Sequence, residues 1–188
     1  NRITAEGLTG KRIIKVIVND ICCYASHTNF DVMGMGDEAA ERLALEERSV
    51  LEITFEDELS QEGIGRVGIL PECMTLRECA SYVKETFDLD TVKVFGEEDR
   101  KVRKAAVVPG AGKDYIRQAV RAGADVYITG DIGHHDGTDA LEQGLTIIDA
   151  GHFGVEQIFV PYMKEFLSRE LPSIHLLSAR QQEPFWYE

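Results

Sequence analysis

The sequence has no run of about 18 apolar residues, which a membrane-spanning helix requires, and no signal-peptide pattern. It also lacks a cluster of basic residues. Its 33 Asp and Glu residues outnumber its 20 Lys and Arg residues, which gives a formal net charge of -13. Such a charge repels nucleic-acid phosphates and anionic membranes. We therefore expect a cytoplasmic protein that binds neither a membrane nor nucleic acid.

Cysteine is scarce, and its spacing forms no metal-binding pattern. The four cysteines are Cys22, Cys23, Cys73 and Cys79. They include no CxxC pair, and their spacing does not match that of the histidines. We expect them to be buried free thiols of a cytosolic protein.

The chain has enough apolar residues to form a core. It contains 188 residues, of which 44% are hydrophobic, and short β-rich runs alternate with amphipathic segments. This pattern predicts an α/β fold in which helices flank a mixed sheet. No shift in composition marks a domain boundary, so we treat residues 1–188 as a single unit.

Local patterns give the expected elements. Predicted helices span 10–20, 36–45, 75–87, 113–123 and 138–144, and a long helix begins at about His152. Predicted strands span 21–28, 49–57, 65–70, 91–96, 104–110, 124–130, 145–151 and 173–178. Thr75 and Glu78 form a capping box that starts one helix. The two consecutive strand–helix units after Val107 predict parallel strands.

Histidines follow three of these strands. His27 comes after the first, His134 and His135 after 124–130, and His152 after 145–151. Ligands bind at the carboxyl ends of parallel strands in sheets of this kind. His175 lies inside a predicted strand, and we interpret it as a core or edge residue.

His152 and Glu156 are four residues apart at the start of a predicted helix, so both side chains project from one face. Imidazole nitrogen and carboxylate oxygen are ligands of Zn²⁺ and Fe²⁺. A solvated pair on a helix surface is the alternative. Asp31 and His27, in the stretch "HTNFD", could reach the same edge of the sheet, but Asp31 also suits a helix cap or a turn.

Two other stretches at strand ends could carry chemistry. In "GHHDGTD", His134 and His135 could transfer protons, because an imidazole titrates near neutral pH. The alternative is a loop that leads to a helix cap at Thr138. The glycine turn in "VVPGAGKDYI" weakly indicates anion binding, since it lacks the phosphate-binding motifs of nucleotide enzymes.

Together these stretches resemble one family, the Nif-three-like dinuclear metal-centre hexameric proteins, also described as GTP cyclohydrolase I type 2-like. The resemblance covers nearly the whole chain in family order. It runs through "YASHTNFD", "GIGRVGIL", "MTLRECASYVKETF", "VKVFG", "VVPGAG", "ADVYITGDIGHHDGTDALEQG", "IDAGHFGVE" and "EPFWY".

The resemblance implies two similar halves around a metal-binding cleft, two divalent metal ions (Zn, Fe or Mn) in that cleft, and a hexameric ring. Residue by residue, it assigns Asp31, His152 and Glu156 as metal ligands and His27 as a near-metal residue. The family's other ligands are two adjacent histidines in a first segment with no counterpart here. We therefore expect an incomplete metal site. The family's loop at the glycine turn also differs, which weakens the case for an anion there.

The resemblance and the residues together suggest a metal-dependent hydrolase that acts on a small molecule. The family name implies a nucleotide, GTP, as that substrate. His134 and His135 would be the catalytic proton carriers. The alternative is a non-catalytic, ring-forming protein that binds metal for folding or regulation. A metal-free α/β domain is the third interpretation.

Overall fold

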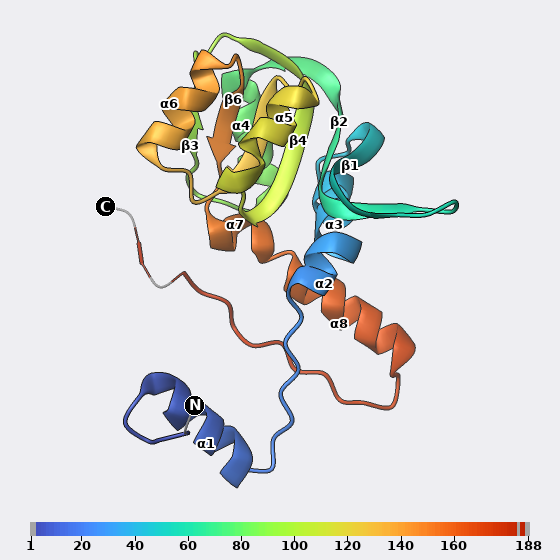
Figure 1. Ribbon diagram of the computed structural model, residues 1–188, viewed down its shortest axis with the longest axis vertical. Helices are drawn as coiled ribbons and strands as arrows, with labels where there is room; N and C mark the ends of the chain where they lie inside the picture. The colour runs from blue at the N-terminus through green and yellow to red at the C-terminus, as the bar shows by residue number, and fades with distance from the viewer. Residues whose placement is uncertain (1–2, 184, 187–188) are drawn as a thin grey trace.

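The computed structural model describes residues 3–183 and 185–186, in which six strands form one mixed sheet (Figure 1). The strand order is β1-β2-β4-β5-β6-β3. The strands are β1 Glu46–Glu56, β2 Gln61–Thr75, β3 Lys93–Phe95, β4 Lys101–Ala111, β5 Val126–Gly130 and β6 Thr146–Asp149. Neighbours β4, β5 and β6 are parallel, as the two strand–helix units predict, and the other pairs are antiparallel. The two similar halves that the resemblance implies stay a prediction.

Helices pack on both faces of this sheet. The α-helices are α1 Leu8–Val18, α2 Thr28–Phe30, α3 Gly36–Arg42, α4 Leu76–Phe87, α5 Ile116–Arg121, α6 His134–Glu142, α7 His152–Glu156 and α8 Phe159–Glu170. A π-helical turn, η1 Asp31–Met35, precedes α3, and a 3-10 turn, η2 Lys113–Tyr115, precedes α5. The predicted mixed sheet flanked by helices is therefore confirmed.

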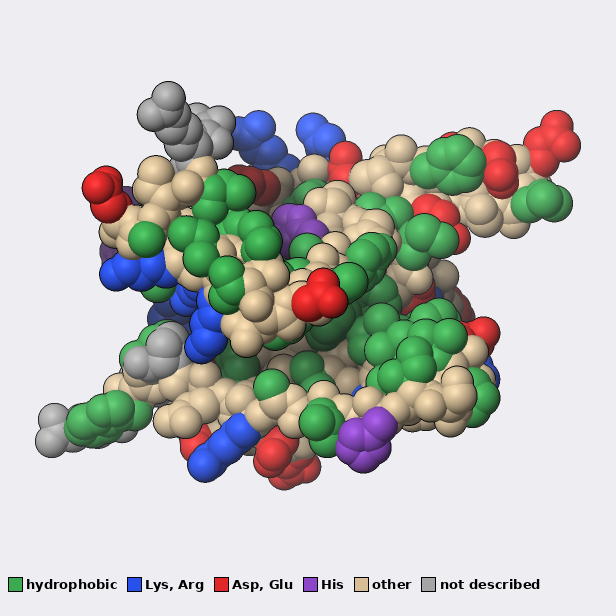
Figure 2. Space-filling model, turned by 90° about the horizontal axis from the view of Figure 1, so that it is seen from below, with side chains coloured by type: hydrophobic (Ala, Val, Ile, Leu, Met, Phe, Trp, Pro, Cys, Tyr) green, Lys and Arg blue, Asp and Glu red, His purple; other side chains and the backbone are tan. Residues whose placement is uncertain are grey.

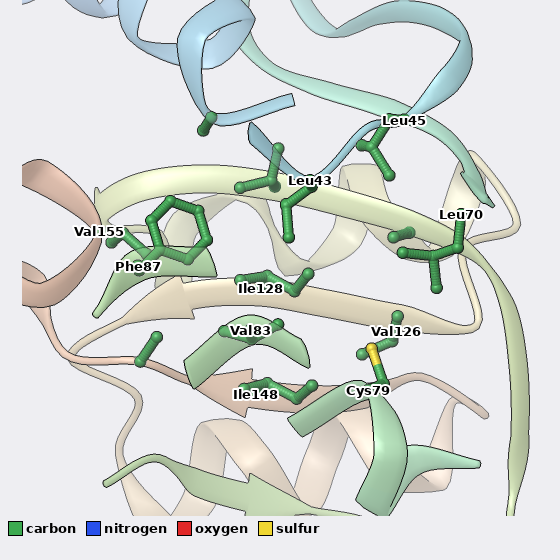
Figure 3. Packing of buried hydrophobic residues seen from close by; sticks show 14 of the residues in the cluster. Leu43, Leu45, Leu70, Cys79, Val83, Phe87, Val126, Ile128, Ile148 and Val155 are labelled. Carbon is green, nitrogen blue, oxygen red and sulfur yellow. The ribbon is translucent and has the colours of Figure 1, made fainter. Parts of the chain in front are cut away.

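Alternation along the strands divides the core between the two faces. Val126 and Ile128 belong to the cluster on the side of α3, α4 and α7, whereas Tyr127 belongs to the cluster under α5 and α6. Figure 3 shows Val83 of α4 beside Ile128 and Ile148. All three side chains are fully buried. Burial of each isoleucine stabilises the fold by roughly 1.5–3 kcal/mol.

The capping box is present at the start of α4. The Thr75 side chain accepts a hydrogen bond from the Glu78 amide, and the Glu78 carboxylate accepts one from the Thr75 amide. Two of the amide groups that a helix start leaves unpaired are thereby satisfied. The charge-assisted bonds also lower the pKa of Glu78.

The predicted strand at 21–28 is wrong. Residues 21–27 form no regular structure, and α2 begins at Thr28, because no neighbouring strand lies alongside to accept their hydrogen bonds. Cys22, Cys23 and Cys73 are exposed, so the prediction of buried cysteines holds only for Cys79. Burial raises the pKa of the Cys79 thiol to about 12.

Two predictions near the C-terminus are also wrong. The long helix from His152 is interrupted after Glu156, and α8 begins at Phe159. Pro161 accounts for the break, because proline has no amide to continue the helix and is tolerated in a first helical turn. Residues 175–183 contain no strand, and His175 is exposed rather than in the core.

The segment before α2, with α1, extends away from the sheet, whereas the chain after α8 turns back toward it, and Gln181 lines the cavity described below (Figure 1). α1 contributes no buried residue, and Leu8, Ile17 and Val18 on it are exposed. Figure 2 shows that apolar side chains occupy much of the surface seen from below. Trp186 is exposed too, while Tyr187 lies outside the described residues. In the part of the chain that the structure describes, no helix is long and apolar enough to cross a membrane.

Candidate metal centre

The parallel pairing of β5 and β6 places their carboxyl ends side by side. Thr129 pairs with Asp149 at this edge, and the Ala150 amide donates to the Thr129 carbonyl at 2.7 Å. Asp131 follows β5 directly, and His152 begins α7 two residues after Ala150. Two loops from different parts of the sequence therefore meet at one place.

His152 lies between two carboxylates. Its Nδ1 lies 2.9 Å from Oδ2 of Asp131, and its Nε2 lies 3.1 Å from Oε1 of Glu156. An ionised carboxylate only accepts hydrogen bonds, so Nδ1 donates to Asp131. Glu156 comes from the same helical turn, as the four-residue spacing predicted. Asp131 thus orients the ring through Nδ1, and Nε2 faces the Glu156 carboxylate, which is a potential metal ligand.

The two carboxylates also change the charge state of the ring. Partial burial lowers the pKa of His152, but the hydrogen bond to Asp131 and the negative charges of Glu156 and Asp131 outweigh it. The net effect is a pKa above the ordinary value. At a given pH, a larger fraction of His152 is therefore protonated than of an ordinary histidine. A cation that binds Nε2 has to displace this proton.

Asp31 and His27 come from a distant part of the chain and line the same cavity as Glu156. Asp31 is the first residue of η1 and is half-buried. Burial raises its pKa, and the charges of His27 and His152 oppose that rise. Both histidines must therefore lie within electrostatic range of the Asp31 carboxylate. His27 itself is exposed, with Nδ1 2.9 Å from the Thr28 hydroxyl.

A cavity of about 220 Å³ opens beside these groups. Asp31, His27 and Glu156 contribute polar groups to its wall. The remaining lining residues are Ser26, Phe30, Met35, Phe153, Gln157, Phe159 and Gln181. The wall therefore combines apolar side chains with polar and ionisable groups, as ligand sites commonly do.

Two glycines allow the close approach of the backbone around His152. Gly110, at φ +79°, lies so close to Glu156 that a Cβ would collide with its carboxylate oxygen. A Cβ at Gly130 would collide with the backbone of Gly151 and His152. The glycine turn after Val107 thus packs against a carboxylate. A negative group at this position disfavours the predicted anion site.

His134 and His135 lie on the neighbouring loop and have a different environment. They are the first residues of α6 and both are exposed. Their ring centroids are 5.5 Å apart. Among residues 3–183 and 185–186, no hydrogen bond or ion pair joins either side chain to His152. The helix starts at His134 rather than at the predicted Thr138.

The donor groups fit part of a metal site. His152 Nε2 and the Glu156 carboxylate face each other. The other ring nitrogen, Nδ1, donates to Asp131, as the second nitrogen of a metal-binding histidine usually does to a carboxylate. Within the described residues, however, no three His, Cys, Asp or Glu side chains are grouped closely enough to hold a metal ion. The completeness of the ligand set stays a prediction.

Sequence reasoning missed Asp131. Its signal was its place, directly after a predicted strand and next to the histidine pair, where carboxylates often serve a site. Asp131 adopts a left-handed backbone conformation, φ +58°, which is uncommon outside glycine and less so for aspartate. The contact with His152 joins residues 21 positions apart, so no local pattern reveals it.

The fold and the site define an α/β protein with a carboxylate–histidine cluster at the carboxyl edge of its parallel strands. Residues 1–184 match the family model described as Duf34/NIF3 (NGG1p interacting factor 3), and the chain belongs to this family.

Relatives and solved structures agree with this assignment. A protein of Clostridium acetobutylicum called GTP cyclohydrolase 1 type 2 homolog is 38% identical over 173 residues, which are 91% of this chain and 64% of that protein. A Clostridium perfringens protein of the same name is 34% identical over 97% of this chain and 71% of its own length. The chain thus spans less than two thirds of the first of these relatives.

Among solved structures, a Bacillus cereus protein related to NIF3 has a TM-score of 0.87 and 26% identity, and the match covers 100% of this chain and 79% of that one. Reduced HcgD from Methanocaldococcus jannaschii has a TM-score of 0.73 and 33% identity, over 91% of this chain and 65% of that one.

Proposed function

We propose that this chain carries part of a dinuclear divalent-metal centre of a hydrolase. The observation that supports this most is the arrangement of His152 between Asp131 and Glu156, with Asp31 in electrostatic range. An isolated solvated pair would not need a second carboxylate on the other ring nitrogen. Membership of the family adds to the proposal, because the resemblance implies two metal ions.

The roles follow from the chemistry of the groups. His152 Nε2, the Glu156 carboxylate and the Asp31 carboxylate would hold Zn²⁺, Fe²⁺ or Mn²⁺, with His27 close by. A bound divalent ion would polarise the bond under attack and acidify a water molecule. Asp131 would fix the tautomer and the orientation of the His152 ring.

Proton transfer is the role we propose for His134 and His135. They lie on the loop next to Asp131 and are open to solvent, so they can exchange protons freely. A substrate that reached from the cluster toward α6 would contact them. Because no hydrogen bond or ion pair joins them to His152 in the described residues, this role depends on a substrate that reaches both places.

A small-molecule substrate would occupy the cavity beside Asp31 and Glu156. The printed name of the Clostridium relatives, GTP cyclohydrolase 1 type 2 homolog, favours a nucleotide. The aromatic side chains of Phe30, Phe153 and Phe159 in the wall offer surfaces suited to a planar ring. Hydrolysis is the broader proposal and ring opening of GTP the narrower one.

The second candidate is a non-catalytic, hexameric metal-binding protein of the cytoplasm. Two observations favour it. Among the described residues, His134 and His135 make no hydrogen bond or ion pair with the cluster, and the apolar side chains of α1 are uncovered in the single chain. Exposed apolar surface of this kind is typical of subunit contacts.

Elemental analysis after incubation with Zn²⁺, Fe²⁺ or Mn²⁺ tests the metal proposal, with His152→Ala and Glu156→Gln as the variants that should lose metal. Hydrolysis of nucleotides and simpler esters is then assayed on the metal-loaded protein. Loss of hydrolysis in His134→Ala and His135→Ala with metal retained supports the hydrolase. Bound metal without any hydrolysis favours the second candidate, and absence of metal contradicts both.

A further inference from the structure

We propose that Asp149 is a positioning residue, which sets the distance between Asp131 and His152. Asp149 is the last residue of β6, and its side chain is only 7% exposed. Among the described residues, its side chain forms no hydrogen bond with the His152 ring or the Glu156 carboxylate. A buried carboxylate at this place must be compensated by its neighbours.

Its two oxygens hold two different loops. Oδ2 accepts a hydrogen bond from the Ile132 amide at 3.0 Å, and Oδ1 accepts one from the Gly151 amide at 3.1 Å. Ile132 follows Asp131, and Gly151 precedes His152. One rigid side chain therefore connects the backbone beside each partner of the 2.9 Å contact between Asp131 and His152.

Lys93 of β3 completes this arrangement. Its Nζ lies 2.8 Å from Oδ2 of Asp149 and donates to the Ile132 carbonyl at 2.6 Å. The ammonium offsets the charge of the buried carboxylate and binds the same loop a second time. The β5–α6 loop is thus held at both the amide and the carbonyl of a single residue, Ile132.

The bonds of Asp149 and Lys93 to Ile132 hold the backbone conformation of Asp131. A left-handed backbone is unfavourable for a residue with a side chain, so the surroundings must hold it. The bonds to Ile132 are the immediate ones on its C-terminal side. Release of Ile132 would let Asp131 relax and move its carboxylate away from His152. The consequence for a metal ion rests on the proposed function, whereas the effect on the His152 ring does not.

The test compares Asp149→Asn with Asp125→Asn in the whole chain. Asp125 is a matched control, because its Oδ2 also accepts two backbone amides, those of Arg103 and Lys104 at 2.9 Å each, but it precedes β5 at the opposite end of the strand. Asparagine keeps the size of the side chain and one acceptor oxygen. It cannot accept hydrogen bonds on both sides as the carboxylate does.

Two readouts separate positioning from general stability. The first is the NMR signal of the hydrogen-bonded His152 ring N–H at fixed pH without metal. The second is Co²⁺ affinity and the visible absorption spectrum of the complex. Asp149→Asn should shift or remove the ring signal, weaken Co²⁺ binding about 10–100-fold and alter the spectrum, as loss of a supporting hydrogen bond does at other metal sites. Asp125→Asn should leave both readouts unchanged.

An unchanged ring signal in folded Asp149→Asn, or an equal loss in Asp125→Asn, would overturn the inference. If the wild-type chain binds no Co²⁺, the metal proposal fails, and the ring signal alone decides the role of Asp149. If Asp149→Asn does not fold, Lys93→Met replaces it, since Lys93 is more than half exposed and its loss leaves the two amide bonds of Asp149 in place. A smaller shift of the same ring signal is then expected, and no shift would overturn the inference.

Discussion

Histidines follow both β5 and β6, yet the two loops present them differently. His152, after β6, lies between two carboxylates, and one of them, that of Glu156, lines the cavity. His134 and His135, after β5, face solvent at the start of α6. Both loops are at the same edge of the same sheet, so position in the fold does not account for the contrast.

The contrast arises from which residue directly follows each strand. After β5 the chain supplies Asp131, which extends across to the histidine of the other loop. After β6 it supplies a short glycine-containing link and then α7, whose first turn carries both His152 and Glu156. One loop provides the ligand, and the other provides the group that orients it. A histidine at a strand end therefore becomes a potential ligand only with such partners.

The largest expected effect is on metal affinity, and it distinguishes His152 from His134 and His135. His152→Ala should weaken Zn²⁺ or Mn²⁺ binding by about 100-fold or more, since a direct ligand counts for more than the supporting groups. His134→Ala and His135→Ala should change it less than about threefold on the same reasoning. Isothermal titration calorimetry with each ion provides the measurement. Equal losses in all three variants would abolish the distinction between the loops.

Asp131→Asn should have the next largest effect. The amide can no longer act as an ionised acceptor for Nδ1, and metal affinity should fall about 10–100-fold. Asp136→Asn, in the first turn of α6 with its carboxylate near Gly133, is the matched control. Competition with a chelating dye measures both. Wild-type affinity in Asp131→Asn would show that the 2.9 Å contact does not orient the ring.

A pair of glycine substitutions tests how tightly the loops are packed. Gly130→Ala would force a Cβ into the backbone of Gly151 and His152, which should destabilise the fold by about 1–3 kcal/mol. Gly133→Ala meets only the end of the Asp136 side chain, which can turn away, so its cost should be small. Chemical denaturation measures the free energy of unfolding of each. A harmless Gly130→Ala would show that the two loops have room to separate.

The smallest expected effect is on pH dependence in the metal-free protein. The pKa of His152 is raised in the folded state, so its interactions stabilise the fold fully below the ordinary value of 6.5 and are lost as pH rises through the folded pKa. The difference in unfolding free energy between wild type and His152→Gln should therefore shrink as pH increases across this window. A difference that grows with pH would reverse the assigned sign.

Much of the fold follows from local pattern. Thr75 and Glu78 mark the start of α4 by side-chain chemistry within four residues, and the β-rich run around Tyr127 identifies β5. One failure depends on distant neighbours, and the other on a local proline that the prediction of a continuous helix overlooked. Residues 21–27 are apolar enough for a strand but have no partner strand, and Pro161 interrupts a helix that the apolar pattern alone would continue.

The candidate site divides in the same way. The spacing of His152 and Glu156 predicted their contact, because both lie on one helical turn. The contacts of Asp131 and Asp149 could not be predicted, since their partners come from another strand or loop and depend on the parallel register of β5 and β6. Asp31 was assigned through the family resemblance, and its electrostatic link to His152 appears only in the folded chain.

The most direct test of the central claim is anomalous diffraction from crystals of this chain soaked in Zn²⁺. The account predicts a peak between His152 Nε2 and the Glu156 carboxylate, on the side facing Asp31, with Asp131 still on Nδ1. A peak at His134 and His135 instead, or no peak at His152 in crystals that bind Zn²⁺ elsewhere, would contradict it.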